Sequence, residues 1–356
     1  MQRTVITGTG SYIPEVIRKN SDFHSGSFYL EDHTLLDSPA EVITTKFQEI
    51  TGIEERRYAS PAQVSTDLAF HASKQAIADA GIDAETLDQI IYTHNYGDVP
   101  FGTNQSDTVP SLAARLKHKL GIHNPFCVAY DVLFGCPGWV QGVIHADAFF
   151  KAGVAGKILV VGSETLSRVI DTHDRDSMIF SDGAGAAVLE SVDRDDNSGV
   201  ISCASVSYCS DELDYINFGC SYQPSSSTDL RFIKMKGRKV YEFAIKYVPS
   251  AISHCLEKAG ISVHEVSKFF IHQANEKLDE AIIRTLFKQH GQRTLPEGIL
   301  PMNIHKLGNS SVATVPTLYD MVRRGNLEGH SLQQGDIIVF AAVGAGMHIN
   351  AVVYRV

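Results

Sequence analysis

The chain repeats a helix–strand pattern at a fixed offset of about half its length. Residues 80–82 and 90–92 match 259–261 and 269–271, and residues 158–161 match 337–340, both at an offset of 179 (260 − 81 and 337 − 158). The repeat predicts a tandem duplication of an α/β half in a chain of 356 residues, with βαβ units in each half. Two such halves facing each other would bring their strand ends to one central site.

Periodicity and turn residues predict most of the regular elements. Strands are expected near 4–10, 89–93, 157–162, 181–189, 268–273, 335–341 and 350–356, and helices near 65–80, 110–121, 137–152 and 240–258. Residues 20–45, 94–109 and 207–230 are expected to form loops. The pair Gly8 and Gly10 lacks the third glycine of a dinucleotide loop, so a structural turn is expected there.

Composition excludes several classes of protein. A formal charge of −10 argues against general nucleic-acid binding. No apolar run approaches the roughly 18 residues of a membrane helix, so no membrane insertion is expected. The start of the sequence lacks the pattern of a signal peptide, and the six cysteines are irregularly spaced, which favours a reducing cytoplasm without a disulfide framework. No motif indicates a metal site or a cofactor.

Cys136 stands where a predicted strand turns into a helix. An apolar run from Val128 is followed by the turn Gly-Cys-Pro-Gly, in which Pro137 suits the first helical position. Backbone N–H groups and the helix dipole at such a place favour negative charge, so the thiol is expected to ionise readily and act as a nucleophile. The alternative is a buried, inert cysteine.

Two later motifs complete a chemical set. His272 ends an apolar strand, and Asn309 follows a glycine before a helix. Taken singly, the first would more often be a core histidine and the second a turn or N-cap residue. Together with Cys136 they can form an acyl-cysteine and donate hydrogen bonds to the enolate of a second thioester. The glycine-rich turn 344–346 can present backbone N–H groups to an acyl oxyanion.

These motifs resemble those of β-ketoacyl-acyl-carrier-protein synthase III, in the thiolase superfamily. The matching stretches, which follow the family order over nearly the whole chain, are 130–138, 160–164, 181–188, 272–275, 308–311 and 344–346. The resemblance implies a five-layered α/β/α/β/α thiolase fold, a homodimer and a pantetheine tunnel leading to the cysteine. The two halves would be residues 1–195, carrying the cysteine, and 196–356, carrying the histidine and the asparagine.

The resemblance also implies roles for individual residues. Cys136 would be the nucleophile, and His272 and Asn309 would bind the enolate oxygen. The backbone N–H groups of Cys136 and Ala345 would form the oxyanion hole. Asn275 falls where the family contacts pantetheine, and Lys277 where a basic residue docks the acyl carrier protein.

Several positions depart from the family pattern. The tryptophan and arginine that hold the adenine of coenzyme A are replaced by Lys46 and Ile50, which puts priming by acetyl coenzyme A in doubt. Val109 replaces the phenylalanine that closes the acyl pocket from the other subunit, and Val343 replaces one linked to malonyl decarboxylation. Both changes favour longer or bulkier acyl chains.

The resulting interpretation is a ketosynthase that makes a carbon–carbon bond by Claisen condensation of acyl thioesters, supplied by acyl carrier protein or coenzyme A. The departures favour specialised lipid or polyketide synthesis of the dialkylcyclohexanedione and dialkylresorcinol type. The alternatives are a fatty-acid-initiating synthase III, an ester- or amide-forming acyltransferase, and a silent thiolase-fold binding subunit. The turn at 344–346 lacks the second cysteine of degradative thiolases, whereas the chalcone-synthase branch shares the same three residues.

Overall fold

Two β-sheets organise the molecule. The computed structural model describes residues 2–193, 196–226 and 229–356. The first sheet has five strands in the order β1 (Gln2–Tyr12), β7 (Asp182–Asp193), β6 (Lys157–Thr165), β4 (Gln89–His94) and β5 (Val128–Leu133). The second has four, in the order β11 (Val266–Ile271), β12 (Ile337–Gly344), β13 (His348–Arg355) and β8 (Gly199–Ser207). The expected domain boundary at 195/196 touches residues 194–195, outside the described residues.

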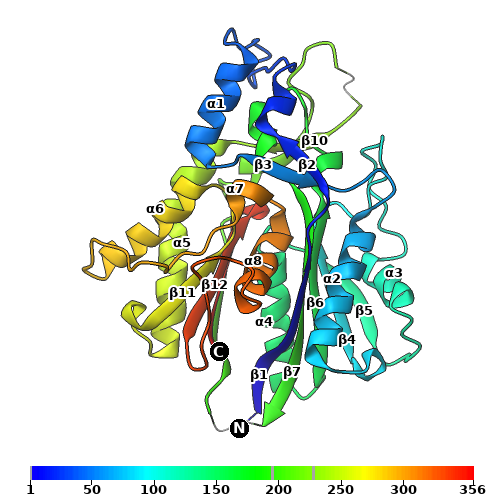
Figure 1. Ribbon diagram of the computed structural model, residues 1–356, viewed down its shortest axis with the longest axis vertical. Helices are drawn as coiled ribbons and strands as arrows, with labels where there is room; N and C mark the ends of the chain where they lie inside the picture. The colour runs from blue at the N-terminus through cyan, green and yellow to red at the C-terminus, as the bar shows by residue number, and fades with distance from the viewer. Residues whose placement is uncertain (1, 194–195, 227–228) are drawn as a thin grey trace.

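Helices form three further layers around the sheets (Figure 1). The central layer holds α4 (Gly138–Lys151) and α8 (Thr314–Arg323), which contact strands of both sheets. The outer layers are α2 (Ser65–Ala80) with α3 (Leu112–Lys119), and α5 (Gly237–Ala259) with α6 (Glu276–Gln289). The predicted five-layered α/β/α/β/α arrangement is therefore confirmed. Its central core joins both halves, as the edge-to-face contact of Trp139 and Phe340 illustrates.

The sequence repeat corresponds to equivalent structural units. Both α2 and α5 end at a glycine with left-handed backbone angles, Gly81 at φ 66° and Gly260 at φ 66°. Each helix is followed by a short 3-10 turn and then by a strand, β4 or β11, that pairs in parallel with β6 or β12. Because L-residues with side chains rarely adopt such φ values, glycine ends both helices at the same place in the repeat.

A cap covers one end of both sheets, at the top of Figure 1. It consists of β2 (Val16–Lys19), β3 (Glu55–Tyr58), α1 (Ala40–Thr51), β9 (Ile216–Gly219), β10 (Phe232–Met235) and α7 (Ile304–Leu307). Two predicted loops therefore contain regular structure. Helix α1 buries Ile43, Thr44, Phe47 and Thr51 at helical spacing, but its threonines hide the apolar period. Strand β9 pairs with β10, which local periodicity does not reveal.

The glycines near the start of the chain allow close packing and do not form the expected turn. Strand β1 runs through Gly8 and Gly10 to Tyr12. A methyl group at Gly8 would lie 2.2 Å from the backbone oxygen of Ala76, and one at Gly10 would lie 2.3 Å from that of Ala72. Both positions therefore let α2 approach the strand more closely than a side chain would permit.

Candidate active site

Cys136 lies between β5 and α4, as predicted, one residue before the N-cap. Pro137 is the N-cap itself, so the helix begins one residue later than expected. Gly135 adopts φ 63°, and a methyl group there would lie 2.8 Å from the backbone nitrogen of Ala345. A methyl group on Gly344 would lie 2.5 Å from the backbone nitrogen of Cys136. The two glycine turns, one from each half, thus bring both expected oxyanion donors to the same place.

His272 follows β11 and is fixed by α8. Its Nδ1 lies 2.7 Å from Thr314 Oγ1, and that hydroxyl donates to the backbone oxygen of Ser311 at 3.0 Å. Since a hydroxyl has a single proton, Nδ1 must donate to Thr314, and the lone pair is left on Nε2. Burial lowers the pKa of His272 to about 4, so the imidazole is neutral at physiological pH.

Asn309 is held by its backbone and by its amide oxygen. Its N–H donates to the oxygen of Ile179 at 2.8 Å, and its carbonyl accepts from the N–H of Ser181 at 2.9 Å. Its Oδ1 accepts from the N–H of Ser311 at 2.8 Å. With the oxygen occupied, the amide NH₂ is available as a hydrogen-bond donor to a bound substrate.

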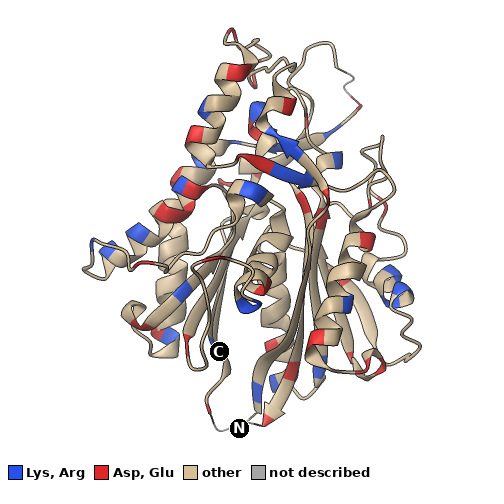
Figure 2. Cartoon of the chain, viewed as in Figure 1, with Lys and Arg blue, Asp and Glu red and all other residues tan. Residues whose placement is uncertain are grey.

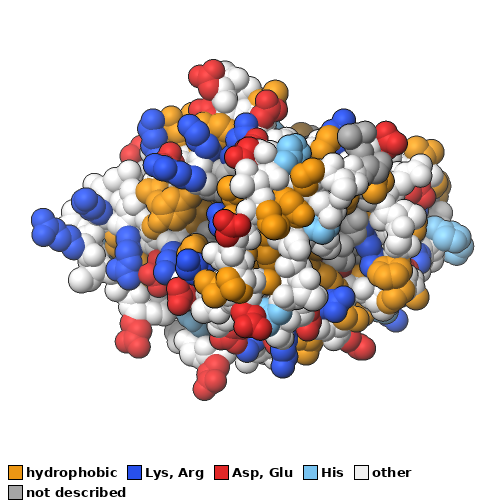
Figure 3. All heavy atoms as spheres, turned by 90° about the horizontal axis from the view of Figure 1, so that it is seen from above, with side chains coloured by type: hydrophobic (Ala, Val, Ile, Leu, Met, Phe, Trp, Pro, Cys, Tyr) orange, Lys and Arg blue, Asp and Glu red, His pale blue; other side chains and the backbone are white. Residues whose placement is uncertain are grey.

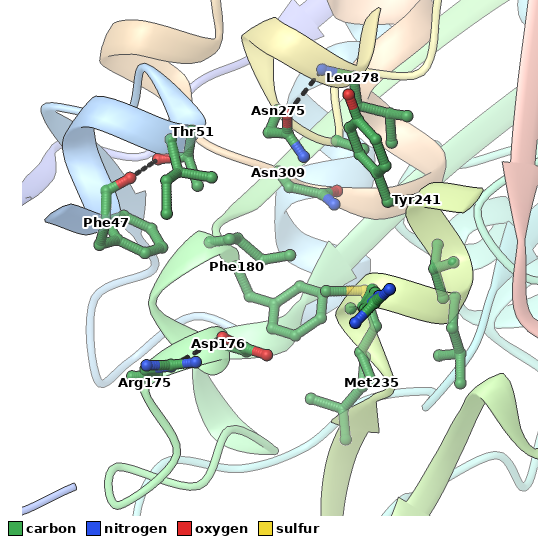
Figure 4. A pocket seen from close by; sticks show the side chains of 18 of the residues that line it. Phe47, Thr51, Arg175, Asp176, Phe180, Met235, Tyr241, Asn275, Leu278 and Asn309 are labelled. Atoms are coloured by element: carbon green, nitrogen blue, oxygen red, sulfur yellow. Dashed lines mark hydrogen bonds and ion pairs between the residues drawn. The ribbon is translucent and has the colours of Figure 1, made fainter. Parts of the chain in front are cut away.

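One cavity of about 530 Å³ brings most of the predicted site residues together. Its lining includes Cys136, His272, Asn309, Asn275, Val343 and Ala345. Figure 4 shows Asn309 and Asn275 beside the apolar wall made by Phe180, Met235 and Tyr241. Lys46 and Ile50 of α1 also line it, so the two positions that depart from the coenzyme A pattern belong to this cavity.

Two predicted site residues lie outside the cavity lining. Val109 precedes α3 in an exposed loop, and 84% of its surface is accessible. Lys277 is exposed in the first turn of α6, next to Leu278, which lines the cavity. Asn275 caps the same helix, accepting from the N–H of Leu278 at 2.8 Å. The expected roles of Val109 and Lys277 both require a second protein surface.

Burial opposes ionisation of the Cys136 thiol. It raises the pKa of the Cys136 thiol to about 11, and the nearby Glu164 carboxylate adds to the increase, while a hydrogen bond from Ser311 works against it. The expectation that a helix start alone favours the thiolate is therefore wrong, because desolvation of the sulfur outweighs it. The thiol needs a proton acceptor to react, and His272, whose Nε2 holds a lone pair, lines the same cavity.

Asn95, Ser311 and Glu164 were not among the predicted functional residues. Asn95 and Ser311 line the cavity, and the carboxyl group of Glu164 is buried against Asn95. A positional signal was available, because Asn95 follows β4 and Glu164 lies near the end of β6, its parallel neighbour. Polar residues at the carboxyl ends of adjacent parallel strands often form binding sites.

Sequence comparison relates most of the chain to known enzymes. Residues 130–208 match the family described as 3-oxoacyl-[acyl-carrier-protein (ACP)] synthase III, and residues 256–356 match its C-terminal part. Beta-ketoacyl-[acyl-carrier-protein] synthase III of Caldanaerobacter subterraneus is 35% identical over 348 residues, which cover 96% of this chain and 94% of the relative. The protein of the same name from Paracoccus denitrificans is 32% identical over 360 residues, with 100% of both chains covered.

Solved structures agree with this likeness. Synthase III from Thermus thermophilus superimposes with a TM-score of 0.80 at 30% identity, covering 99% of this chain and 98% of that chain. The priming β-ketosynthase of the R1128 polyketide biosynthetic pathway gives a TM-score of 0.78 at 26% identity, covering 100% and 96%. The predicted thiolase fold is confirmed by these superpositions.

The described residues contain neither a helix suited to spanning a membrane nor a cluster of metal-binding side chains. None of the helices in that part of the chain combines the length and apolar character needed to cross a membrane. Within the same residues, no group of three or more His, Cys, Asp or Glu is arranged to hold a metal ion.

Proposed function

The chain belongs to the β-ketoacyl-[acyl-carrier-protein] synthase III family and is therefore an acyltransferase of the ketosynthase type, and from this premise we propose that Cys136 is its nucleophile. His272 and Asn309 assist it. The observation that carries this assignment is their convergence, from opposite halves of the fold, on one cavity. Claisen condensation is the reaction of the family, and this set of groups contains what each of its steps requires.

Acyl loading begins with proton transfer from the Cys136 thiol to Nε2 of His272. The sulfur attacks the thioester carbonyl, and the backbone N–H groups of Cys136 and Ala345 stabilise the oxyanion. Collapse breaks the bond to the leaving thiol, which takes the proton back from the imidazolium. The product is acyl-Cys136 with a neutral His272, ready for the second substrate.

Condensation then requires an enolate of a second thioester, which forms when the carbon–carboxylate bond of a malonyl thioester breaks and carbon dioxide leaves. The amide NH₂ of Asn309 donates to its oxygen. His272 can donate from Nε2 only as the imidazolium, because the single ring proton of the neutral form is on Nδ1 and is donated to Thr314. The enolate carbon attacks the acyl carbonyl, a carbon–carbon bond forms, and the Cys136 sulfur leaves as the thiolate. The oxyanion hole used in loading serves this step again.

For the biological substrate, the relatives favour the fatty-acid alternative over the dialkylresorcinol interpretation. The curated relatives cited above carry the name β-ketoacyl-acyl-carrier-protein synthase III, and they cover the chain almost completely. The proposal is therefore an initiating condensation that yields a β-ketoacyl chain on acyl carrier protein. Asn275 would contact pantetheine in the cavity, and Lys277 would meet the acidic carrier at its mouth.

The cavity lining supports a second candidate, condensation with longer or bulkier acyl chains in specialised metabolism. Lys46 and Ile50 on α1 offer no aromatic ring for an adenine, and 58% of the surface of Ile50 is accessible. The Val343 side chain takes less space than a phenylalanine would. The wall opposite is apolar over β9, β10 and the start of α5. Such a surface accommodates alkyl chains better than charged nucleotides.

A homodimer is part of the proposal. Strand β5 lies at the edge of the first sheet, and its Val128 and Leu133 are 55% and 67% exposed. An apolar edge strand is suited to pairing with another chain. Helix α3 packs beside β5, so Val109 of the partner subunit would come from the loop next to this edge. Within each subunit, residues 1–195 would carry the cysteine and residues 196–356 would carry the histidine and the asparagine.

Intact-mass spectrometry after incubation with a panel of acyl thioesters tests the proposal. Wild-type protein should gain one acyl group, and a malonyl thioester of the carrier should release it as a β-ketoacyl product. A preference for acetyl and short branched chains would support fatty-acid initiation. A preference for long chains would support the second candidate, condensation in specialised metabolism. Loading followed only by ester or amide formation would contradict the condensation. If no thioester loads the protein, the proposed enzyme function is contradicted and the alternative of a silent thiolase-fold binding subunit is favoured.

A further inference from the structure

A chain of hydrogen bonds that does not include the His272 ring reaches the Cys136 sulfur. The hydroxyl of Ser311 donates to Cys136 Sγ at 3.4 Å. The amide NH₂ of Asn95 donates to the Ser311 hydroxyl at 2.9 Å and to Glu164 Oε1 at 2.5 Å. The backbone N–H of Asn95 donates to the same carboxyl oxygen at 2.5 Å.

The direction of each bond follows from the chemistry of the groups. A hydroxyl has one proton, and Asn95 already donates to the oxygen of Ser311, so the Ser311 proton points at the sulfur. Asn95 can donate in this way only with its NH₂ group toward Ser311. Glu164 enforces that orientation, because its carboxyl oxygen would repel the amide oxygen of a flipped Asn95.

Two members of this hydrogen-bond chain, Ser311 and Glu164, are in energetically unfavourable states. Ser311 has φ 54°, a left-handed conformation that is unusual for a residue other than glycine. Glu164 is 1% exposed, and its Oε2 has no hydrogen-bond partner among the described residues. Strain and an incompletely satisfied buried acid both destabilise a fold, and they concentrate where function requires them.

We propose that Ser311 is a catalytic hydrogen-bond donor to the Cys136 sulfur, and that Asn95 and Glu164 are positioning residues that aim its hydroxyl. The Ser311 donor matters most when the thiol proton has moved to His272 and the sulfur carries a full negative charge. This inference rests on the proposed nucleophilic role of Cys136.

Glu164 has a second, opposing effect. When ionised, its carboxylate disfavours the thiolate, and burial raises its own pKa to about 7. Removing its charge should therefore favour the thiolate, whereas removing the Ser311 hydroxyl should disfavour it. The other titratable groups that face Cys136 or Glu164 are His94, Tyr92, Tyr96, Asp182 and His272.

The test is the pH dependence of alkylation at Cys136 by iodoacetamide, followed by peptide mass spectrometry. Exposed Cys209 serves as an internal reference in each sample. Ser311→Ala should slow alkylation of Cys136 at pH 8 by about 10- to 100-fold, the range expected for losing a hydrogen bond to a charged group. Glu164→Gln keeps an acceptor for Asn95 and removes the charge, so alkylation should become about 3- to 10-fold faster.

Matched variants separate this role from a general loss of packing. Ser310→Ala removes the neighbouring hydroxyl and should leave the rate within about twofold. Asn95→Ala should slow alkylation, but Ser311→Ala/Asn95→Ala should be no slower than Ser311→Ala, because Asn95 acts through Ser311. Additive losses in the double variant, an unchanged rate in Ser311→Ala, or slower alkylation in Glu164→Gln would each overturn the proposal.

Acyl loading measured on the same samples distinguishes two failures. Wild-type loading together with unchanged alkylation in Ser311→Ala would overturn the hydrogen-bond chain and leave the proposed function intact. Slower alkylation in Ser311→Ala without loading by any thioester would support the hydrogen-bond chain and contradict the proposed function.

Discussion

His272 is hydrogen-bonded through Nδ1 to Thr314, the first residue of α8, while Cys136 directly precedes the N-cap of α4. Both helices of the central layer therefore begin at the active site (Figure 1). One start carries Cys136, the proposed nucleophile, and the other orients His272, the proposed base. Because α4 and α8 are packed between both sheets, the relative position of these two groups is set by a buried core cluster to which both sheets contribute.

Thr314→Val should weaken catalysis without unfolding the protein. The change keeps the branched shape but removes the oxygen that accepts from Nδ1, so the imidazole loses its fixed tautomer. We expect kcat to fall about 10-fold with little change in KM, since the cavity keeps its shape. Steady-state kinetics test this, with Thr317→Val, one turn further along α8, as the matched control. Equal losses of kcat in Thr314→Val and Thr317→Val would contradict the role of Thr314 in orienting His272.

Cys136→Ala should abolish acyl loading. Cys136 lines the cavity, whereas none of the other five cysteines is among its lining residues. Intact mass after incubation with an acyl thioester gives the answer, and Cys127→Ala, a change at another buried thiol, provides the control. An acyl group found on Cys127 or Cys255 of the Cys136 variant would contradict the nucleophile assignment.

His272→Ala and Asn309→Ala should separate the two half-reactions. With the pKa of Cys136 near 11, the thiol needs the His272 lone pair, so His272→Ala should lose loading as well as condensation. Asn309→Ala removes only a donor to the enolate, so condensation should fall about 10²–10³-fold while loading continues. Single-turnover measurements of each step decide this. Normal loading in His272→Ala would show that another group accepts the proton.

The buried acid Glu164 should make stability depend on pH. Burial raises its pKa to about 7 from an ordinary 4.5. The folded protein thus binds the proton more tightly than the unfolded chain. The stabilisation is complete below pH 4.5 and is lost as pH rises toward 7. Urea unfolding at pH 5 and pH 8 should show that Glu164→Gln removes up to about 3 kcal/mol of this dependence. Glu280→Gln, a change on α6, should leave the pH dependence of stability as it is in the wild type. An equal difference in stability between pH 5 and pH 8 in the wild type and both variants would contradict the prediction.

Lys277→Glu should slow loading from acyl carrier protein and leave loading from acyl coenzyme A nearly unchanged. Figure 2 shows basic residues interspersed with acidic ones along α6 and α1, and Figure 3 shows Lys and Arg side chains gathered on one side of the capped face. An acidic carrier would approach this surface with a rate that falls as salt rises. Lys288→Glu, in the last turn of α6, is the matched control. Faster loading from coenzyme A at low salt would contradict carrier delivery.

The layered fold was predictable because its signals are local and repeated. The glycines that end α2 and α5, and the apolar strands that follow, are visible in the sequence at one offset. The boundaries of α4 were predicted within two residues for the same reason. Helix α1 and strand β9 were missed because their stability comes from contacts made across the cap.

The site was predictable only in its motif residues. Cys136, His272 and Asn309 stand in recognisable turns, and the structure brings them to one cavity. Asn95 stands in a polar loop without a motif, and its importance follows from contacts with residues 69 and 216 positions away. The thiol pKa was predicted in the wrong direction, because a helix start can be read from sequence and the desolvation of a sulfur cannot.

The contact between Gly344 and the Cys136 backbone joins residues 208 positions apart (344 − 136). Contacts of such sequence separation form late in folding, since a large loop must close first. During synthesis on the ribosome, the thiol is made long before the turn that supplies its second oxyanion donor. If Cys136 is the nucleophile as proposed, a nascent or partly folded chain should not be acylated there by cellular thioesters, and the thiol should become reactive only once both glycine turns have met.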